Sequence, residues 1–383
     1  MNSKCAQEQS QHSRPHAGLC AKERVPSTPP PWPQLLRRGL VSLDQLEAKG
    51  WLDAEHPREA LNAAQEALDI RVPLAFQEAL ERGDISMSKQ VIPATEEAFF
   101  APEELADPIG DEVFSPHPGL THRYPDRALV KITYQCAMYC RFCFRRHKVS
   151  HSEENLSFEA LQPAYQYIDT HPEIREVIFT GGDPLVLTDA RLEEHLGRVE
   201  SMPHIETIRF HTRIPSALPE RITAALCERL SQSPKMPWVV VHMNSASELT
   251  HTTLAALLRL RRHGIGLASQ TVLLKGVNDS PKALEALLRG LYRAGVVPYY
   301  LHFPDLARGT SHFRIPLTEA LSLMDSLKGH LPGLAIPRLT VDIPGGWGKI
   351  EVNASTSRQI TKNIWEFKSP LTSQWIKIQY PDA

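Results

Sequence analysis

The sequence predicts an α/β protein built on a partial (β/α)6 barrel, with a small helical domain before it. From near Leu120, six short runs rich in β-branched and aromatic residues alternate with longer stretches of helical periodicity. Runs such as 239–241 are apolar without alternation, which is typical of strands covered on both faces. Strand–helix units repeated in this way form a parallel sheet with right-handed crossovers. We therefore expect the functional residues at the carboxyl ends of the strands.

Each element of the barrel follows from its own pattern. Between the strands, apolar residues recur at steps of three and four, as in the helix expected around Leu284, Leu287, Leu288 and Leu291. A further β-like run, 338–343, leads into a glycine-rich segment. The six expected strands are residues 128–134, 176–180, 207–212, 238–243, 267–274 and 297–302.

The chain divides into four parts. Residues 1–33 are polar and rich in proline without periodicity, so we expect a disordered tail. Leucines at helical spacing predict an N-terminal helical domain over 34–118. The core barrel then covers 119–340, and 341–383 form a C-terminal segment whose aromatic residues, Trp365, Phe367 and Trp375, are expected to pack it onto the body or onto a second subunit.

Composition excludes several classes of protein. With 42% hydrophobic and 22% charged residues, the chain has the composition of a soluble globular protein. Its formal net charge of −2 argues against a dedicated nucleic-acid surface. No apolar run reaches the length of a membrane span, and the first 33 residues lack the apolar core of a secretory signal. We expect a cytoplasmic protein that binds neither nucleic acid nor membranes.

Three cysteines in one loop, Cys136, Cys140 and Cys143, follow the first expected strand. A [4Fe–4S] cluster normally has four cysteine ligands, so three thiolates hold three irons and leave the fourth iron open to a small molecule. The spacing, followed by Phe144 and two arginines, resembles the radical S-adenosylmethionine superfamily. The alternative is a structural zinc site with His147 as the fourth ligand, although zinc sites usually take their second pair from a distant segment.

Three further features suit a small-molecule site at the strand ends. Gly181 and Gly182, followed by Asp183, end the second strand and would let backbone approach a ligand closely. Lys349 follows three glycines. This segment is either a simple turn or the site of a lysine that forms a Schiff base with pyridoxal phosphate. Five arginines near strand ends suit carboxylate or phosphate groups: Arg123, Arg127, Arg145, Arg146 and Arg213.

Taken together, the motifs resemble the lysine 2,3-aminomutase family over about residues 90–355. They are Arg123-Tyr-Pro-Asp-Arg127, the cysteine loop with Phe144-Arg145-Arg146, Gly181-Gly-Asp-Pro184, Thr212-Arg213, 269–279, Tyr299-Tyr-Leu-His302, Asp305, 312–314 and 341–349. The resemblance implies a partial barrel of the radical S-adenosylmethionine type. It also implies three cofactors: a [4Fe–4S] cluster, S-adenosyl-L-methionine and pyridoxal 5′-phosphate.

The resemblance also implies a role for each matching residue. Lys349 would be the catalytic lysine that binds pyridoxal phosphate, and Arg145 would hold the substrate carboxylate. Asp305 and Asp342 would accept the ε-ammonium of L-lysine. The phosphate of pyridoxal phosphate would lie among Arg123, Arg127, Arg213 and Gln270. The iron–sulfur cluster would be bound by Cys136, Cys140 and Cys143. S-adenosylmethionine would lie against Gly181, Gly182 and Asp183.

The implied reaction moves the 2-amino group of L-lysine to carbon 3, through a 5′-deoxyadenosyl radical and a pyridoxal phosphate aldimine, to give β-lysine. Two aspartates would repel a side-chain carboxylate, which disfavours glutamate as a substrate. A reductant such as flavodoxin or ferredoxin is expected as a partner, and a homodimer is the simplest assembly left open. We expect none of the additional interface zinc found in clostridial-type members.

Several alternatives stay open at this stage. One is the branch of the same family that makes (R)-β-lysine for attachment to elongation factor P. Another is a 2,3-aminomutase for a different cationic amino acid, because two aspartates accept a guanidinium nearly as readily as an ammonium. Trp347 stands where the family more often has glycine, which leaves the substrate open. A non-catalytic iron–sulfur or zinc protein is disfavoured by the presence of Lys349 with the arginine set.

Overall fold

The computed structural model describes residues 31–52 and 57–380. The tail expected over 1–33 therefore lies almost entirely outside the described residues. Its last residues are not irregular, since helix α1 (Trp32–Leu36) begins at Trp32. Pro33 stands in the first turn of this helix, where its missing N–H costs no hydrogen bond.

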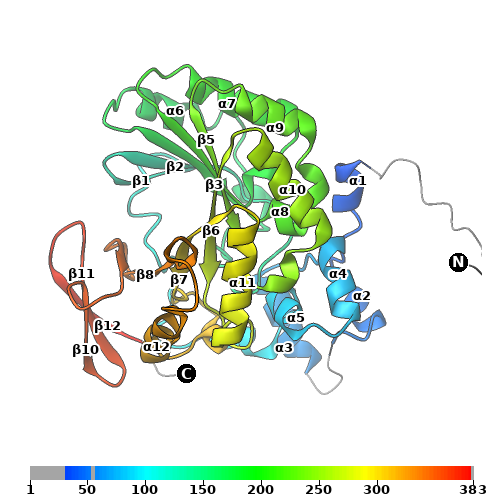
Figure 1. The fold of residues 1–383 in the computed structure, drawn as a ribbon, viewed down its shortest axis with the longest axis vertical. Coiled ribbons are helices and arrows are strands. Elements are labelled where there is room, and N and C mark those ends of the chain that lie inside the picture. The colour runs from blue at the N-terminus through cyan, green and yellow to red at the C-terminus, as the bar shows by residue number, and fades with distance from the viewer. Residues whose placement is uncertain (1–30, 53–56, 381–383) are drawn as a thin grey trace, which may run out of the picture.

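The N-terminal helices pack beside the barrel on one flank (Figure 1). After α1 come α2 (Leu43–Ala48), α3 (Arg58–Ala67), α4 (Leu74–Glu81), α5 (Ile85–Val91) and the short 3-10 helix η1 (Thr95–Ala98). Two helices begin at side-chain caps: Ser42 accepts a hydrogen bond from the Gln45 amide, and Asp84 accepts one from the Met87 amide. Their buried leucines join the main core, so the helices are part of one body with the barrel.

The barrel is a nine-stranded sheet in the linear order β1 to β9. Strands β2 to β8 pair in parallel, while β1 and β9 are antiparallel edge strands. The expected α/β partial barrel is confirmed. The expected count of six parallel strands falls one short, because the run at 338–342 is a seventh. The strands are β1 (Leu120–Tyr124), β2 (Arg127–Thr133), β3 (Glu176–Gly181), β4 (Thr207–Thr212), β5 (Met236–His242), β6 (Gly266–Val272), β7 (Val297–His302), β8 (Arg338–Asp342) and β9 (Lys349–Glu351).

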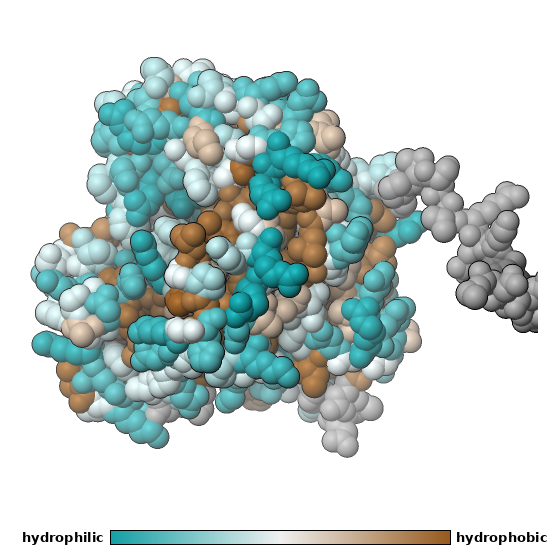
Figure 2. All heavy atoms as spheres, in the orientation of Figure 1, coloured by the Kyte–Doolittle hydropathy of each residue, from teal (hydrophilic) through white to brown (hydrophobic). Residues whose placement is uncertain are grey.

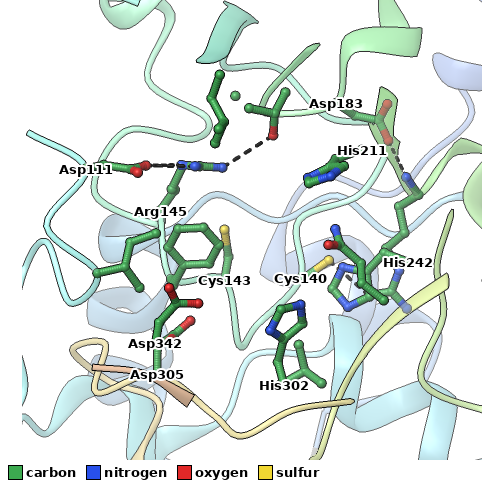
Figure 3. A pocket seen from close by; sticks show the side chains of 18 of the residues that line it. Asp111, Cys140, Cys143, Arg145, Asp183, His211, His242, His302, Asp305 and Asp342 are labelled. Carbon is green, nitrogen blue, oxygen red and sulfur yellow. Dashed lines mark hydrogen bonds and ion pairs between the residues drawn. The ribbon is translucent and has the colours of Figure 1, made fainter. Parts of the chain in front are cut away.

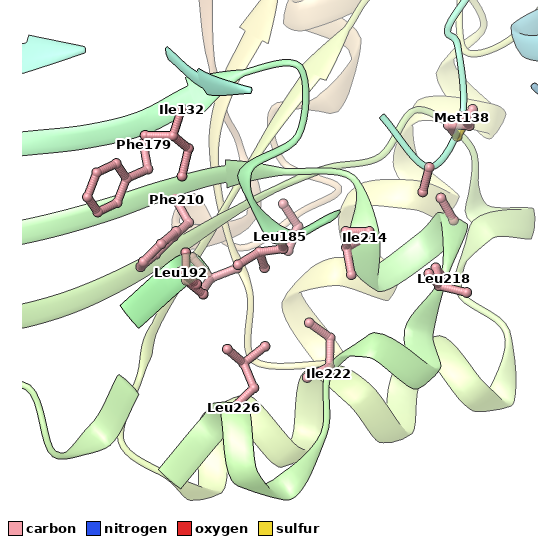
Figure 4. Packing of buried hydrophobic residues seen from close by; sticks show 14 of the residues in the cluster. Ile132, Met138, Phe179, Leu185, Leu192, Phe210, Ile214, Leu218, Ile222 and Leu226 are labelled. Carbon is pink, nitrogen blue, oxygen red and sulfur yellow. The ribbon is translucent and has the colours of Figure 1, made fainter. Parts of the chain in front are cut away.

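Helices cover the outside of the sheet. They are α6 (Gln162–Asp169), α7 (Asp189–Glu200), α8 (Ile214–Ala217), α9 (Ala224–Ser231), α10 (His251–Arg262), α11 (Pro281–Arg293) and α12 (Leu317–Leu327). Helix α11 starts at a Ser280 cap with proline at the next position, and it buries the four leucines predicted from spacing. Between sheet and helices, Phe179 and Phe210 of adjacent strands pack with Leu192 of α7 (Figure 4).

The chain ends in a small antiparallel sheet of β10 (Ser357–Thr361), β11 (Ile364–Lys368) and β12 (Trp375–Gln379). Trp365 and Phe367 are buried in a hydrophobic cluster that includes Leu301 of β7 and Leu323 of α12. In this cluster Tyr380 contacts Phe367 edge to face. Trp375 remains 37% exposed beneath the Arg358 guanidinium. The boundary expected at residue 340 cuts through β8, because β8 and β9 belong to the barrel sheet.

The surface in the orientation of Figure 2 is mainly hydrophilic, with apolar side chains visible chiefly towards the middle of the view. None of the helices in the described part of the chain is both long and apolar enough to span a membrane.

Candidate active site

A cavity of about 510 Å³ lies at the carboxyl ends of the parallel strands. Its wall combines residues of strands β1 to β9, the cysteine loop and the segment around Asp111 that precedes the barrel. Every residue to which the family resemblance assigns a role lines this one cavity: Arg123, Arg127, Cys136, Cys140, Cys143, Arg145, Gly181, Gly182, Asp183, Arg213, Gln270, Asp305, Asp342 and Lys349. Figure 3 views part of it from close by.

Lys349 is fixed at the first residue of β9. Its backbone N–H donates to the Tyr124 hydroxyl at 2.7 Å, and β9 pairs so that Lys349 lies opposite Asp342. The turn between the two strands requires positive φ at Gly345, Gly346 and Gly348, a conformation that suits glycine. The Lys349 Nζ atom then lies 2.8 Å from Asp342 Oδ2 and 3.2 Å from His302 Nδ1.

Asp305 and Asp342 form an acidic pair beside this lysine. Their carboxylates lie next to each other (Figure 3). Burial, with the neighbouring charge of Asp342, raises the pKa of Asp305 to about 8. Asp342 is also held from the other side, where its Oδ1 lies 3.2 Å from Nη1 of Arg123. A cation bound beside the pair would favour the ionised form of Asp305, so the two aspartates form a site that can accept a cation.

Two arginines and a glutamine line the neighbouring part of the wall. Arg123 is buried and donates from Nη2 to the Ile109 carbonyl at 2.6 Å, while its Nε has no partner among the residues described. Arg127 is more exposed, lies over the Tyr124 ring and pairs with Asp126 at 2.7 Å. Gln270 sits on β6 opposite Tyr300 of β7. These groups can bind an anionic group such as a phosphate.

The cysteine loop follows β2 directly. Burial raises the pKa of the three thiols, and raises that of Cys143 to about 11. Within 31–52 and 57–380, no three His, Cys, Asp or Glu side chains are grouped so as to hold one metal ion. Three spaced thiols on one loop suit a [4Fe–4S] cluster in which three of the four irons each take one thiolate.

Arg213 lies on the cysteine side of the cavity. Its Nη1 donates to Cys140 Sγ at 3.0 Å, and its Nη2 donates to Gln90 at 2.5 Å and Glu248 at 2.9 Å. The sequence had assigned Arg213 to the phosphate, but these contacts tie it to the cysteine loop. Arg146, another arginine singled out above, is buried on Glu97 at 2.6 Å and does not line the cavity.

The glycine turn after β3 approaches the cysteine-bearing segment closely. A Cβ at Gly181 would lie 2.1 Å from the Thr133 carbonyl oxygen, and one at Gly182 would lie 2.3 Å from that of Gln135. Asp183 holds the turn: its carboxylate accepts hydrogen bonds from the Leu185 amide, the Thr212 hydroxyl and the Arg213 amide. Asp183 therefore shapes the turn, while the glycine backbone meets the cavity.

Sequence reasoning missed several cavity residues. Three histidines end or nearly end strands β4, β5 and β7: His211, His242 and His302. Burial lowers the pKa of all three, that of His242 to about 3, so the imidazoles are neutral. Their place at strand ends was the available signal. Asp111 gave no such signal, because it lies in an irregular segment before the barrel. Trp347, flagged for its unusual identity, does not line the cavity.

Comparison with known proteins places this geometry in a family. Residues 130–288 match the Radical SAM superfamily. L-lysine 2,3-aminomutase of Fusobacterium nucleatum is 36% identical over 324 residues, which cover 84% of this chain and 76% of that protein. The chain belongs to the L-lysine 2,3-aminomutase family. It is therefore an isomerase, and the family's cofactors are a [4Fe–4S] cluster, S-adenosyl-L-methionine and pyridoxal 5′-phosphate.

Other members of the family match to a similar extent. The L-lysine 2,3-aminomutase of Escherichia coli is 38% identical over 310 residues, which cover 80% of this chain and 90% of that protein. The protein of the same name from Methanococcus maripaludis is 44% identical over 264 residues, or 69% of this chain and 61% of its own length. Among solved structures, a radical SAM methyltransferase from Sphaerobacter thermophilus aligns with a TM-score of 0.39 and 17% identity, over 58% of this chain and 68% of its own.

The cavity residues fit the family's cofactors. On the cysteine side, three half-buried cysteines share one loop, and the glycine turn is too close to the segment leading into that loop to admit a Cβ. On the lysine side, an amine lies beside a neutral imidazole, and the buried Nε of Arg123 has no partner within the described ranges. The three cysteines thus suit an iron–sulfur cluster, and the lysine with the nearby arginine suits pyridoxal phosphate, which carries both an aldehyde and a phosphate.

Proposed function

We propose that this chain rearranges L-lysine to β-lysine by moving the 2-amino group to carbon 3. Family membership supports the reaction type. The observation that carries the substrate is the acidic pair Asp305–Asp342 in the same cavity as Arg145. Lysine has a carboxylate at one end and an ammonium at the other, so a cavity with a guanidinium and a carboxylate pair complements both.

Charge decides between lysine and other amino acids. A buried ammonium is stable only when it is paired. An ammonium bound beside Asp305 would favour loss of the proton from that carboxyl, so that both aspartates pair with it. The same two carboxylates would repel the side chain of glutamate or aspartate. Arg145 is buried, lines the same cavity and can meet the substrate carboxylate. These groups favour a cationic amino acid over a neutral or acidic one.

We assign Lys349 as the residue that binds pyridoxal phosphate covalently. When bound, this cofactor would supply the conjugated system that stabilises a radical during migration of the amino group. For Lys349 to react, its Nζ must lose a proton, and two acceptors lie within reach: Asp342 Oδ2 at 2.8 Å and His302 Nδ1 at 3.2 Å. Burial keeps His302 neutral, so its ring can accept a hydrogen bond from Nζ. Arg123, Arg127 and Gln270 are proposed to hold the phosphate.

We assign Cys136, Cys140 and Cys143 as the cluster ligands, with Gly181 and Gly182 holding S-adenosylmethionine. The cluster and S-adenosylmethionine together would supply the radical that removes hydrogen from the substrate. Arg213 is proposed to stabilise the cysteine loop through Cys140 rather than to hold the phosphate. The role of the barrel is to keep these groups together and away from bulk water.

The finer alternatives differ in product and partner. The elongation factor P branch would give (R)-β-lysine, and arginine would be a guanidinium-bearing substrate for the same carboxylate pair. A flavodoxin or ferredoxin is proposed as reductant, and a homodimer as the assembly. The substrate that reacts and the enantiomer that forms are separate outcomes of the experiment below.

The test is an anaerobic assay. The cluster is reconstituted, and S-adenosylmethionine, pyridoxal phosphate, dithionite and either L-lysine or L-arginine are added. We expect β-lysine from lysine, resolved by chiral chromatography, and no product from a Lys349→Ala control. The enantiomer distinguishes the two branches. Cleavage of S-adenosylmethionine with lysine left unchanged would overturn the assignment of substrate through Asp305 and Asp342.

A further inference from the structure

Asp111 lines the cavity and forms an ion pair with Arg145, the arginine proposed to bind the substrate carboxylate. One of its oxygens, Oδ2, is 2.8 Å from Nε and 2.7 Å from Nη2 of Arg145 (Figure 3). This contact occupies the side edge of the guanidinium. The remaining amino group, Nη1, points to the end of β3, where the Thr180 hydroxyl lies at 3.4 Å. The end edge of Arg145 is therefore the part that faces a ligand.

Asp111 has more cationic neighbours than its single charge balances. Arg123 lies 3.7 Å from its Oδ1, and Lys131 of β2 is buried nearby with its ammonium on the Thr121 hydroxyl at 2.6 Å. Burial would raise the pKa of Asp111, but the charges of Arg145, Lys131 and Arg123 outweigh burial and hold this pKa below its ordinary value. Asp111 is thus ionised among these cationic side chains.

The backbone of Asp111 is held in place from both sides. Its N–H donates to Asp107 Oδ1 at 2.9 Å, and its carbonyl accepts from the Ser115 hydroxyl at 2.7 Å. The preceding residue, Gly110, packs against the turn that leads to Lys349: a Cβ there would lie 2.6 Å from the Cα of Gly346. A segment outside the barrel is therefore built rigidly into the cavity.

We propose that Asp111 is a positioning residue that sets the carboxylate specificity of the site: it fixes the side edge of Arg145 so that the end edge receives the substrate's α-carboxylate. This proposal rests on the proposed function, in which Arg145 binds that carboxylate. It adds a specificity residue from the N-terminal segment, which the barrel motifs do not include. A long arginine side chain loses much rotational freedom on binding, and holding it in advance removes that cost.

The opposite role is also physically reasonable, and it predicts the opposite result. If Asp111 only competed with the substrate for Arg145, its removal would strengthen binding of any carboxylate. If it positions Arg145, its removal weakens binding of a carboxylate ligand and leaves a ligand without a carboxylate unaffected. Two ligands of equal length separate these cases: L-lysine, and 1,5-diaminopentane, which lacks the carboxylate.

The experiment is calorimetric titration of the holoprotein, with cluster and pyridoxal phosphate loaded and S-adenosylmethionine omitted so that no turnover occurs. Wild type should prefer L-lysine to 1,5-diaminopentane. In Asp111→Asn, affinity for L-lysine should fall about tenfold to a hundredfold, with 1,5-diaminopentane unchanged. In Asp111→Glu, which restores the charge, the preference should return to within about threefold of wild type.

The matched control is Glu104→Gln. Glu104 is also a buried carboxylate paired with a buried arginine, Arg314, but it does not line the cavity. This variant should keep the wild-type preference. Equal weakening of both ligands in Asp111→Asn, tighter binding of L-lysine, or the same preference in Asp111→Glu as in Asp111→Asn would overturn the proposal. If wild type itself does not distinguish the two ligands, the assignment of Arg145 fails together with it.

Discussion

Lys349 and Asp342 are partners twice, through the backbone and through their side chains. They lie opposite each other in the antiparallel pairing of β8 with β9, and their charged groups are 2.8 Å apart. A glycine-rich turn joins the two strands and brings the lysine back over the cavity. The pairing explains why the C-terminal segment must belong to the barrel sheet: it delivers the amine to the acidic pair.

The first prediction separates the nucleophile from the charge at position 349. Lys349→Arg keeps a cation for Asp342 and should fold normally, but a guanidinium cannot bind pyridoxal phosphate covalently. We expect no retention of the cofactor after borohydride reduction and dialysis, measured by mass spectrometry, and no aminomutase activity. Lys148→Arg, on a surface lysine paired with Glu112, is the control and should retain the cofactor. Retention in Lys349→Arg would move the attachment site to another lysine.

The second prediction concerns the pH dependence of stability through Asp305. Burial raises its pKa to about 8, whereas in the unfolded chain it loses its proton near the ordinary aspartate pKa of 3.8. The folded state thus keeps a proton that the unfolded state releases, so the stabilising contribution is present below the unfolded pKa and is lost as pH rises through about 8. Asp305→Asn carries no charge and should melt about 2–4 °C higher than wild type at pH 8.

Calorimetry or differential scanning fluorimetry across the same pH range checks this. The gap between Asp305→Asn and wild type should narrow as pH falls toward 4, because the unfolded Asp305 then increasingly keeps its proton as the folded one does. A gap that does not depend on pH would mean that Asp305 is ionised in the folded protein. The same variant should bind L-lysine about tenfold to a hundredfold more weakly, since one carboxylate of the pair is gone.

The third prediction tests the changed assignment of Arg213. Because its guanidinium donates to Cys140 Sγ and Glu248, Arg213→Gln should lower the iron content after reconstitution and alter the electron paramagnetic resonance of the reduced cluster. Affinity for pyridoxal phosphate should stay within about threefold of wild type, since the contacts of Arg213 lie elsewhere. Arg123→Gln should do the reverse. A large loss of pyridoxal phosphate affinity in Arg213→Gln would restore the phosphate assignment made from sequence.

The sequence predicted the barrel, and it predicted which residues share one cavity, because both depend on local patterns. Strand–helix alternation is a local signal, and residues that follow parallel strands must meet at one edge of the sheet. Lys349 and the cysteines therefore fell in one cavity. The pattern of residues 338–342 predicts a β-like run but not a seventh barrel strand. Its place in the barrel depends on parallel pairing with β7, a long-range contact that the residues of the run do not determine.

Contacts within the cavity could not be predicted in the same way. Arg145 and Arg146 are neighbours in sequence, yet one faces the cavity and the other is buried on Glu97 of the N-terminal region. Arg213 follows a strand end, as the phosphate assignment required, but Gln90 and Glu248 hold it toward Cys140. Asp111 lies in an irregular segment with no periodicity. These outcomes depend on which distant side chain satisfies each guanidinium, and spacing does not encode that.

The last prediction concerns the glycine turn after β3. A Cβ at Gly182 would lie 2.3 Å from the Gln135 carbonyl oxygen and 2.7 Å from the Tyr134 carbonyl carbon, so Gly182→Ala must push the turn away from the cysteine segment. We expect a loss of about 1–3 kcal/mol in unfolding free energy, together with weaker binding of S-adenosylmethionine, measured by denaturant titration and calorimetry. Gly197→Ala is the matched control, because a Cβ there meets only the Glu193 side chain at 4.0 Å, and alanine in helix α7 should stabilise the chain by about 0.5–1 kcal/mol. If Gly182→Ala binds S-adenosylmethionine as tightly as Gly197→Ala does, close backbone approach at this turn is not what holds that cofactor.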